Sequence, residues 1–173
     1  MIYKIAITGP ESTGKSSLSK ALAEHFNTVW VAEYARDFVD ETGGNYKYED
    51  IEFIARKQAQ LEDEAMAKAN KILFCDTDAL VTKVWSEFVF NKCSPWIEER
   101  YNQNTYHLYL LCNVDIEWQY DPLREHPNQR QELFDIYHNQ LSDSNFNFAV
   151  VNGQNEERIA NAIRLVEEFL RDL

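Results

Sequence analysis

The sequence has few basic residues, few cysteines and no long apolar run. Its 173 residues include 17 Lys and Arg against 29 Asp and Glu, which gives a formal net charge of -12. A surface this acidic repels phosphate backbones and anionic lipids, so we expect neither nucleic acid nor a membrane as a partner. No apolar run approaches the roughly 20 residues that a membrane-spanning helix needs.

The three cysteines, Cys75, Cys93 and Cys112, lie far apart and lack the spacing of a metal site. Cys75 and Cys112 stand within apolar runs, where a thiol acts as a small hydrophobic group. The apolar stretch 1–7 is too short for a signal peptide and leads directly into a phosphate-binding motif. We therefore expect no disulfide and a soluble, cytoplasmic protein.

Short apolar runs alternate with segments of helical periodicity along the chain, and no linker-like stretch divides it. The apolar runs cover residues 2–8, 28–32, 72–75, 106–112 and 146–151. Helical spacing is clearest over 49–70 and 156–170. Nearly continuous apolar strands that alternate with helices are typical of βαβ units. We predict a single α/β domain over 1–173, with a mainly parallel central sheet of about five strands and helices on both faces.

Residues 9–16 match the full P-loop pattern Gly-x-x-x-x-Gly-Lys-Ser, between a predicted strand and a helical stretch at 17–26. The glycines let successive N–H groups turn toward phosphate oxygens, and the helix N-terminus adds its partial positive charge. Lys15 is predicted to bridge the terminal phosphates, and the Ser16 hydroxyl to ligate magnesium (Mg2+). The predicted nucleotide-binding residues are Gly9, Glu11, Ser12, Thr13, Gly14, Lys15, Ser16 and Ser17.

Two acidic residues follow the apolar run 72–75. Asp76 ends this run, where a P-loop protein places a carboxylate beside its metal ion, directly or through water. The alternative is that Asp76 caps the helix that begins near Asp78. For Asp78 a helix cap and a substrate contact are both open.

Glu33 ends the apolar run 28–32 and stands three residues before Arg36. A carboxylate in this place can orient an acceptor hydroxyl and take its proton during phosphate transfer. The alternative is that Glu33 caps the following helix, with Arg36 in a surface ion pair.

Residues 121–131 form a Pro-punctuated segment with Arg124 and Arg130, which leads into a predicted helix. An arginine loop here can act as a lid that excludes water and places positive charge on the transferring phosphoryl group. An ordinary solvated loop is the alternative. Because a lid suppresses hydrolysis, it favours a kinase over a switch protein. The Asn-Lys-x-Asp run of guanine sites is absent from 112–115, so ATP is the predicted donor.

The combined motifs resemble the nicotinamide-riboside kinase domain of NadR-type NAD regulators, in the same order over essentially the whole chain. The matching positions are 9–16, 33–39, 76–78, Trp118, 123–124 and 129–131. The resemblance implies a P-loop kinase-like fold with a small lid. It also implies ATP-dependent phosphorylation of the 5′-hydroxyl of nicotinamide riboside to nicotinamide mononucleotide, a step of NAD biosynthesis.

The same resemblance implies roles for individual residues. Glu33, Arg36, Asp76 and Asp78 would lie on the acceptor or metal side, and Arg124 and Arg130 in the lid. Tyr34 and Trp118 are further candidates for acceptor binding. Glu33, Asp76 and Asp78 are alternatives for the general base.

This sequence departs from the NadR-type pattern in two places. It starts at the first strand of the kinase, so we expect a kinase without the helix-turn-helix and adenylyltransferase domains that often precede it. Ala32 stands where the resemblance implies an aromatic residue that stacks on nicotinamide, so Tyr34, Trp30 or Trp118 would have to supply the ring. A kinase for another nucleoside or nucleotide, or a P-loop switch or binding protein, is the alternative function.

Overall fold

The computed structural model describes residues 1–119 and 128–173. Within them, five strands form one sheet in the order β2-β3-β1-β4-β5, and every neighbouring pair is parallel. The strands are β1 (Tyr3–Thr8), β2 (Trp30–Val31), β3 (Ile72–Asp76), β4 (Leu108–Cys112) and β5 (Phe148–Val151). The α/β fold predicted from the alternation of apolar and helical segments is confirmed.

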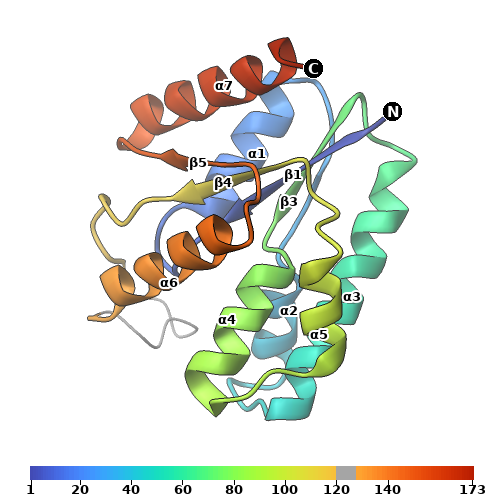
Figure 1. Cartoon of the computed structure of the whole chain (residues 1–173), viewed down its shortest axis with the longest axis vertical. Helices are drawn as coiled ribbons and strands as arrows, with labels where there is room; N and C mark the ends of the chain where they lie inside the picture. Colours follow the sequence, from blue (N-terminus) through green and yellow to red (C-terminus); the bar gives the residue numbers. More distant parts are fainter. Residues whose placement is uncertain (120–127) are drawn as a thin grey trace.

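Seven helices are present in the described residues. They are α1 (Lys15–His25), α2 (Tyr34–Glu41), α3 (Tyr48–Met66), α4 (Ala79–Phe90), α5 (Pro95–Asn102), α6 (Arg130–Asp143) and α7 (Asn155–Arg171). Figure 1 shows α1 and α7 on one face of the sheet, α6 on the other, and α2 to α5 grouped at one end. None of these helices is long and apolar enough to cross a membrane.

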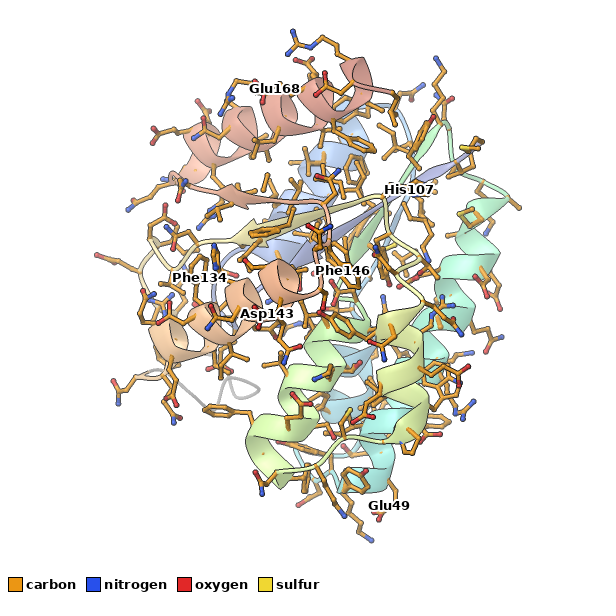
Figure 2. All side chains as sticks on the ribbon, viewed as in Figure 1. Glu49, His107, Phe134, Asp143, Phe146 and Glu168 are labelled. Atoms are coloured by element: carbon orange, nitrogen blue, oxygen red, sulfur yellow. The ribbon has the colours of Figure 1, made fainter. Side chains whose placement is uncertain are left out.

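Helices cover both faces of the sheet, so the side chains that alternate along a strand are buried on either side. Ile5 and Ile7 of β1 pack in the core layer under α1 and α7, whereas Ala6 packs in the layer under α4 and α6. In Figure 2, Phe146 lies beside the sheet while Glu168 lies on the outer surface. This double coverage is the reason that the strands read as continuous apolar runs.

The strand β2 is shorter than the apolar run that predicted it. Only Trp30 and Val31 pair with β3, opposite Phe74 and Cys75, and the chain then leaves the sheet to begin α2. The carboxyl ends of parallel strands lie at one edge of a sheet, where ligands bind in α/β proteins. The P-loop after β1, Glu33 after β2 and Asp76 at the end of β3 therefore meet at this edge.

Candidate active site

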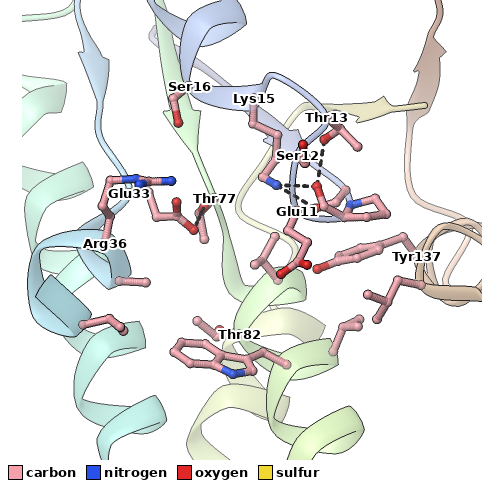
Figure 3. A pocket seen from close by; sticks show the side chains of 18 of the residues that line it. Glu11, Ser12, Thr13, Lys15, Ser16, Glu33, Arg36, Thr77, Thr82 and Tyr137 are labelled. Atoms are coloured by element: carbon pink, nitrogen blue, oxygen red, sulfur yellow. Dashed lines mark hydrogen bonds between the residues drawn. The ribbon is translucent and has the colours of Figure 1, made fainter. Parts of the chain in front are cut away.

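The P-loop joins β1 to α1 through a backbone that requires its glycines. Gly9 has φ 127°, and a Cβ there would lie 3.0 Å from the backbone oxygen of Cys112. Gly14 has φ 77° at the N-cap of α1. The Lys15 ammonium donates hydrogen bonds to the carbonyl oxygens of Gly9 at 2.9 Å and Pro10 at 2.7 Å (Figure 3). The positively charged Lys15 ammonium thus lies along the inner side of the loop.

A cavity of about 440 Å³ opens beneath the P-loop, a size typical of small-molecule sites. Figure 3 shows Glu33 and Arg36 on one side of it, Glu11 and Tyr137 on the other, and Lys15 above. Its polar, charged and aromatic lining includes Glu11, Lys15, Ser16, Glu33, Arg36, Tyr46, Thr77, Trp85, Phe88 and Tyr137. The cavity therefore joins a phosphate-type site to acidic and aromatic side chains.

Asp76 lies at the end of β3, paired with Ile7 of β1, and is only 1% exposed. Neither oxygen of its carboxylate has a hydrogen-bond partner among the described residues. Burial, together with the negative charge of Glu33, raises the pKa of Asp76 to about 6, although the nearby Ser16 hydroxyl and the charges of Lys15 and Arg36 act in the opposite direction. Buried, unpaired carboxylate oxygens beside the Ser16 hydroxyl are a donor set that suits Mg2+. The chemistry of this site fits the metal predicted from the sequence.

In metal-free buffer at about pH 8, we expect Asp76→Asn to melt roughly 5 °C above the wild type. The pKa of Asp76 is raised from 3.8 to about 6 in the folded protein, so its ionised form destabilises the fold. This penalty is absent below pH 3.8 and complete above about pH 6, because only then is the folded carboxylate ionised.

Calorimetry at about pH 4 and about pH 8 should therefore show that the advantage of Asp76→Asn exists only at the higher pH. Asp37→Asn on the exposed side of α2 is the matched control and should melt like the wild type. A gain of equal size at both pH values would contradict the assignment to Asp76 ionisation.

Glu33 occupies the N-cap position of α2, yet its side chain makes no capping hydrogen bond. Its Oε1 instead accepts a hydrogen bond of 3.1 Å from the Thr77 hydroxyl, and its carboxylate lines the cavity. Thr77 holds the left-handed φ of 78°, which turns the chain between β3 and α4. The geometry thus leaves the Glu33 carboxylate directed toward the cavity together with Arg36.

Asp78 has the capping geometry that the sequence left open. Its Oδ1 accepts a hydrogen bond of 2.8 Å from the backbone N–H of Val81 at the start of α4. The residue is 1% exposed, and burial raises its pKa to about 7. Asp78 does not line the large cavity.

None of the three aromatic residues considered from the sequence is among the described residues that line the cavity. The Tyr34 ring packs edge-on against Phe53 with centroids 6.3 Å apart. Trp30 packs on the core layer under α1 and α7. Trp118 precedes the residues that the structure does not describe and does not line the cavity.

The aromatic residues of the cavity wall are ones that the sequence analysis missed. Trp85 donates a hydrogen bond from Nε1 to the Tyr46 hydroxyl at 3.2 Å, and the two rings meet at 63° with centroids 4.8 Å apart. Phe88 lines the cavity from the same helix as Trp85, and Tyr137 from α6. Val81, Trp85 and Phe88 are spaced by four and three residues, so helical periodicity was the signal for this face.

Arg130 connects α6 to the P-loop. Its guanidinium donates hydrogen bonds of 3.0 Å to the carbonyl oxygens of Ser12 and Ile116. The Ser12 hydroxyl also accepts a hydrogen bond of 3.0 Å from the backbone N–H of Gln119. Arg124 and most of the predicted lid at 121–131 lie outside the described residues.

Comparison with known proteins agrees with this geometry. The profile of a family described as "AAA domain" matches residues 4–158. The "Trifunctional NAD biosynthesis/regulator protein NadR" of Escherichia coli K12 is 31% identical over 176 aligned residues, and its counterpart from Salmonella typhimurium LT2 is equally similar. The match covers 98% of this chain but 43% of each relative, so the chain spans less than half of their length.

Solved structures share the same fold. A "NadR protein in complex with NR" superposes with a TM-score of 0.82 at 22% identity, over 97% of this chain and 51% of that one. A thymidylate kinase from Ehrlichia chaffeensis superposes with a TM-score of 0.68 at 14% identity, over 97% and 98% of the two chains. The resemblance to NadR-type domains inferred from the sequence motifs is confirmed by the match to the curated relatives.

Proposed function

The chain belongs to the AAA domain family of P-loop proteins, and we propose that it is an ATP-dependent kinase for the 5′-hydroxyl of nicotinamide riboside. The observation that carries this proposal is one cavity lined by the P-loop, by Glu33 and by the aromatic pair Trp85 and Tyr46. The similarity to NadR supports the acceptor and the donor, because NadR has been solved with NR and with NAD and AMP-PNP.

The P-loop residues supply the donor side of the reaction. Backbone N–H groups of 9–16 and the Lys15 ammonium bind the phosphates of ATP at the start of α1. Ser16 and Asp76 would hold Mg2+, which neutralises charge on the phosphate oxygens when it is bound. Lys15 lies within reach because it already contacts the loop carbonyls of Gly9 and Pro10.

On the acceptor side, we assign the general base to Glu33. Of the three candidate carboxylates, it is the one that lines the cavity, while Asp76 suits the metal and Asp78 caps α4. Glu33 orients the 5′-hydroxyl and accepts its proton as the oxygen attacks the γ-phosphorus. The bond from that phosphorus to ADP breaks, and nicotinamide mononucleotide is released.

The aromatic wall suits the base of this acceptor. The nicotinamide ring of the riboside is planar and positively charged, and such cations are attracted to the faces of Trp and Tyr. Trp85 and Tyr46 lie in the cavity, where Glu11 and Glu33 add negative charge. These residues replace Tyr34, Trp30 and Trp118 as the proposed platform.

We expect Trp85→Leu to raise the KM for nicotinamide riboside about tenfold, because the ring face that attracts the cation is lost. Trp85→Phe keeps an aromatic face and should change this KM by less than about threefold. The affinity for ATP, measured by titration calorimetry, should be unaffected in both. Equal effects of Leu and Phe on the acceptor KM would argue against an aromatic platform.

A coupled assay of ADP release with MgATP and a panel of nucleosides tests the function. We expect nicotinamide riboside to be the acceptor with the largest kcat/KM. Faster phosphorylation of uridine or a deoxynucleoside would overturn the acceptor while keeping the kinase. ADP release that no acceptor stimulates would favour a P-loop switch or binding protein.

We propose a single kinase domain over 1–173, with a lid at 121–131 in which Arg124 and Arg130 act on the transferring phosphoryl group. The acid-rich composition supports an absence of nucleic acid and membrane partners, and the free thiols of Cys75 and Cys112 support the cytoplasm.

A further inference from the structure

Gln58 is a buried amide that both neighbouring active-site segments use. It lies on α3 and is 3% exposed. Its Nε2 donates a hydrogen bond of 3.3 Å to the carbonyl oxygen of Asp76, and its Oε1 accepts one of 2.9 Å from the backbone N–H of Tyr34. Burying an amide is costly unless its groups are paired, and here both ends are paired.

The Gln58 amide lies where the pairing of β2 with β3 has ended. The ladder between β2 and β3 stops at the pair of Val31 and Cys75, and the two chains then diverge. Beyond that pair, Gln58 bridges the carbonyl of Asp76 and the N–H of Tyr34. A side-chain amide carries one acceptor and a donor like a peptide group, so Gln58 continues the ladder across the gap.

The hydrogen bond from Tyr34 also fixes the backbone next to Glu33. Tyr34 is the first residue of α2, and the first N–H groups of a helix need partners from outside it. The side chain of the N-cap residue Glu33 makes no capping hydrogen bond, and its Oε1 accepts one from Thr77. Gln58 satisfies the N–H of Tyr34 from a different helix and so anchors the backbone directly after Glu33.

We propose that Gln58 is a positioning residue for phosphate transfer: it ties the start of α2 to the end of β3, so that Glu33 is held in register with Asp76. This role rests on the proposed kinase function and on Glu33 as its base. Gln58 does not line the large cavity, so we assign it no direct contact with ATP or the acceptor and an effect through the segments that carry Glu33 and Asp76. The P-loop is attached to β1 and α1, and neither hydrogen bond of Gln58 reaches it, so we expect little effect on the binding of ATP.

The test compares Gln58→Met with Gln60→Met on the same helix. Methionine is similar in length and is apolar, so Gln58→Met removes both hydrogen bonds with little change in volume. We expect kcat to fall on the order of tenfold or more, because displacing a reacting group by about 1 Å is costly. The acceptor KM and the Kd for MgATP should stay within about twofold of the wild type. Gln60 is exposed, so Gln60→Met should match the wild type throughout.

A double-mutant cycle separates positioning from mere stabilisation. In a Glu33→Gln background, Gln58→Met should lower kcat by less than about twofold, because the group it positions is already disabled. If the two losses multiply, or if Gln58→Met alone keeps the wild-type kcat, the positioning role is overturned. If the methionine variant does not fold, Gln58→Asn replaces it: the amide is one methylene too short to reach both partners, and an unchanged kcat would overturn the role.

Failure of the function itself gives a different pattern. If the wild type and Gln60→Met both transfer phosphate to no acceptor, the kinase proposal fails and the role of Gln58 in transfer fails with it. If both are active and Gln58→Met is as active as they are, only the role of Gln58 fails.

Discussion

Lys15→Ala is expected to lower kcat for phosphate transfer on the order of a thousandfold, the largest effect of any single change in this protein. Lys15 is the cation that the P-loop directs along its inner side, 2.9 Å and 2.7 Å from two loop carbonyls. During transfer, negative charge develops on the phosphate oxygens in a partly closed cavity, where a fixed positive charge is most effective. The assay is acceptor-dependent ADP release, with circular dichroism to verify the fold.

The matched control for Lys15→Ala is Lys20→Ala. Lys20 lies on the same helix but is exposed, and its ammonium is 4.0 Å from Glu24 in a surface pair. Such pairs contribute little, so this variant should retain full activity and the same melting temperature. Retention of near-full kcat by a folded Lys15→Ala protein would refute the phosphate-binding assignment.

Glu33→Gln should lower kcat on the order of a hundredfold, the range expected when a general base is lost. Glutamine has the same shape and can still accept the hydrogen bond from Thr77, but it cannot take the proton of the acceptor hydroxyl. The Kd for MgATP should change by less than about twofold, because the P-loop belongs to a different strand and helix. Steady-state kinetics and titration calorimetry measure the two quantities separately.

Glu41→Gln at the other end of α2 is the control for this change, since Glu41 is exposed. It removes the same charge from the same helix and should leave kcat unaltered. If Glu33→Gln turned over as fast as Glu41→Gln, the base would have to be sought elsewhere in the cavity.

The proposed roles of Asp76 and Glu33 place two carboxylates close together at this edge, which lowers the stability of the metal-free fold. Asp76 is buried beside Glu33 with no hydrogen-bond partner among residues 1–119 and 128–173, and its pKa is raised to about 6. A structure selected for stability alone would place an amide or an apolar residue there. A cation that binds to Asp76 and Ser16 relieves this repulsion, so the cost in the metal-free protein is expected to disappear on binding.

Much of the fold could be predicted from the sequence because its signals are local. The P-loop pattern lies between a strand and a helix, and the periodicity at 49–70 and 156–170 corresponds to α3 and α7. Boundaries differed where tertiary contacts decide them. The run 28–32 formed only the pair Trp30 and Val31, because the chain must leave the sheet to begin α2.

The sequence by itself determined the P-loop, the order of strands and helices, and the resemblance to NadR-type kinase domains, because each depends on residues close together in the chain. Only the tertiary structure decided which side chains face the cavity. Trp85 and Tyr46 share a hydrogen bond although they are 39 residues apart in the sequence. Gln58 on α3 joins Tyr34 at the start of α2 to Asp76 at the end of β3. Such contacts depend on how helices pack around the sheet edge, and no local pattern encodes that packing.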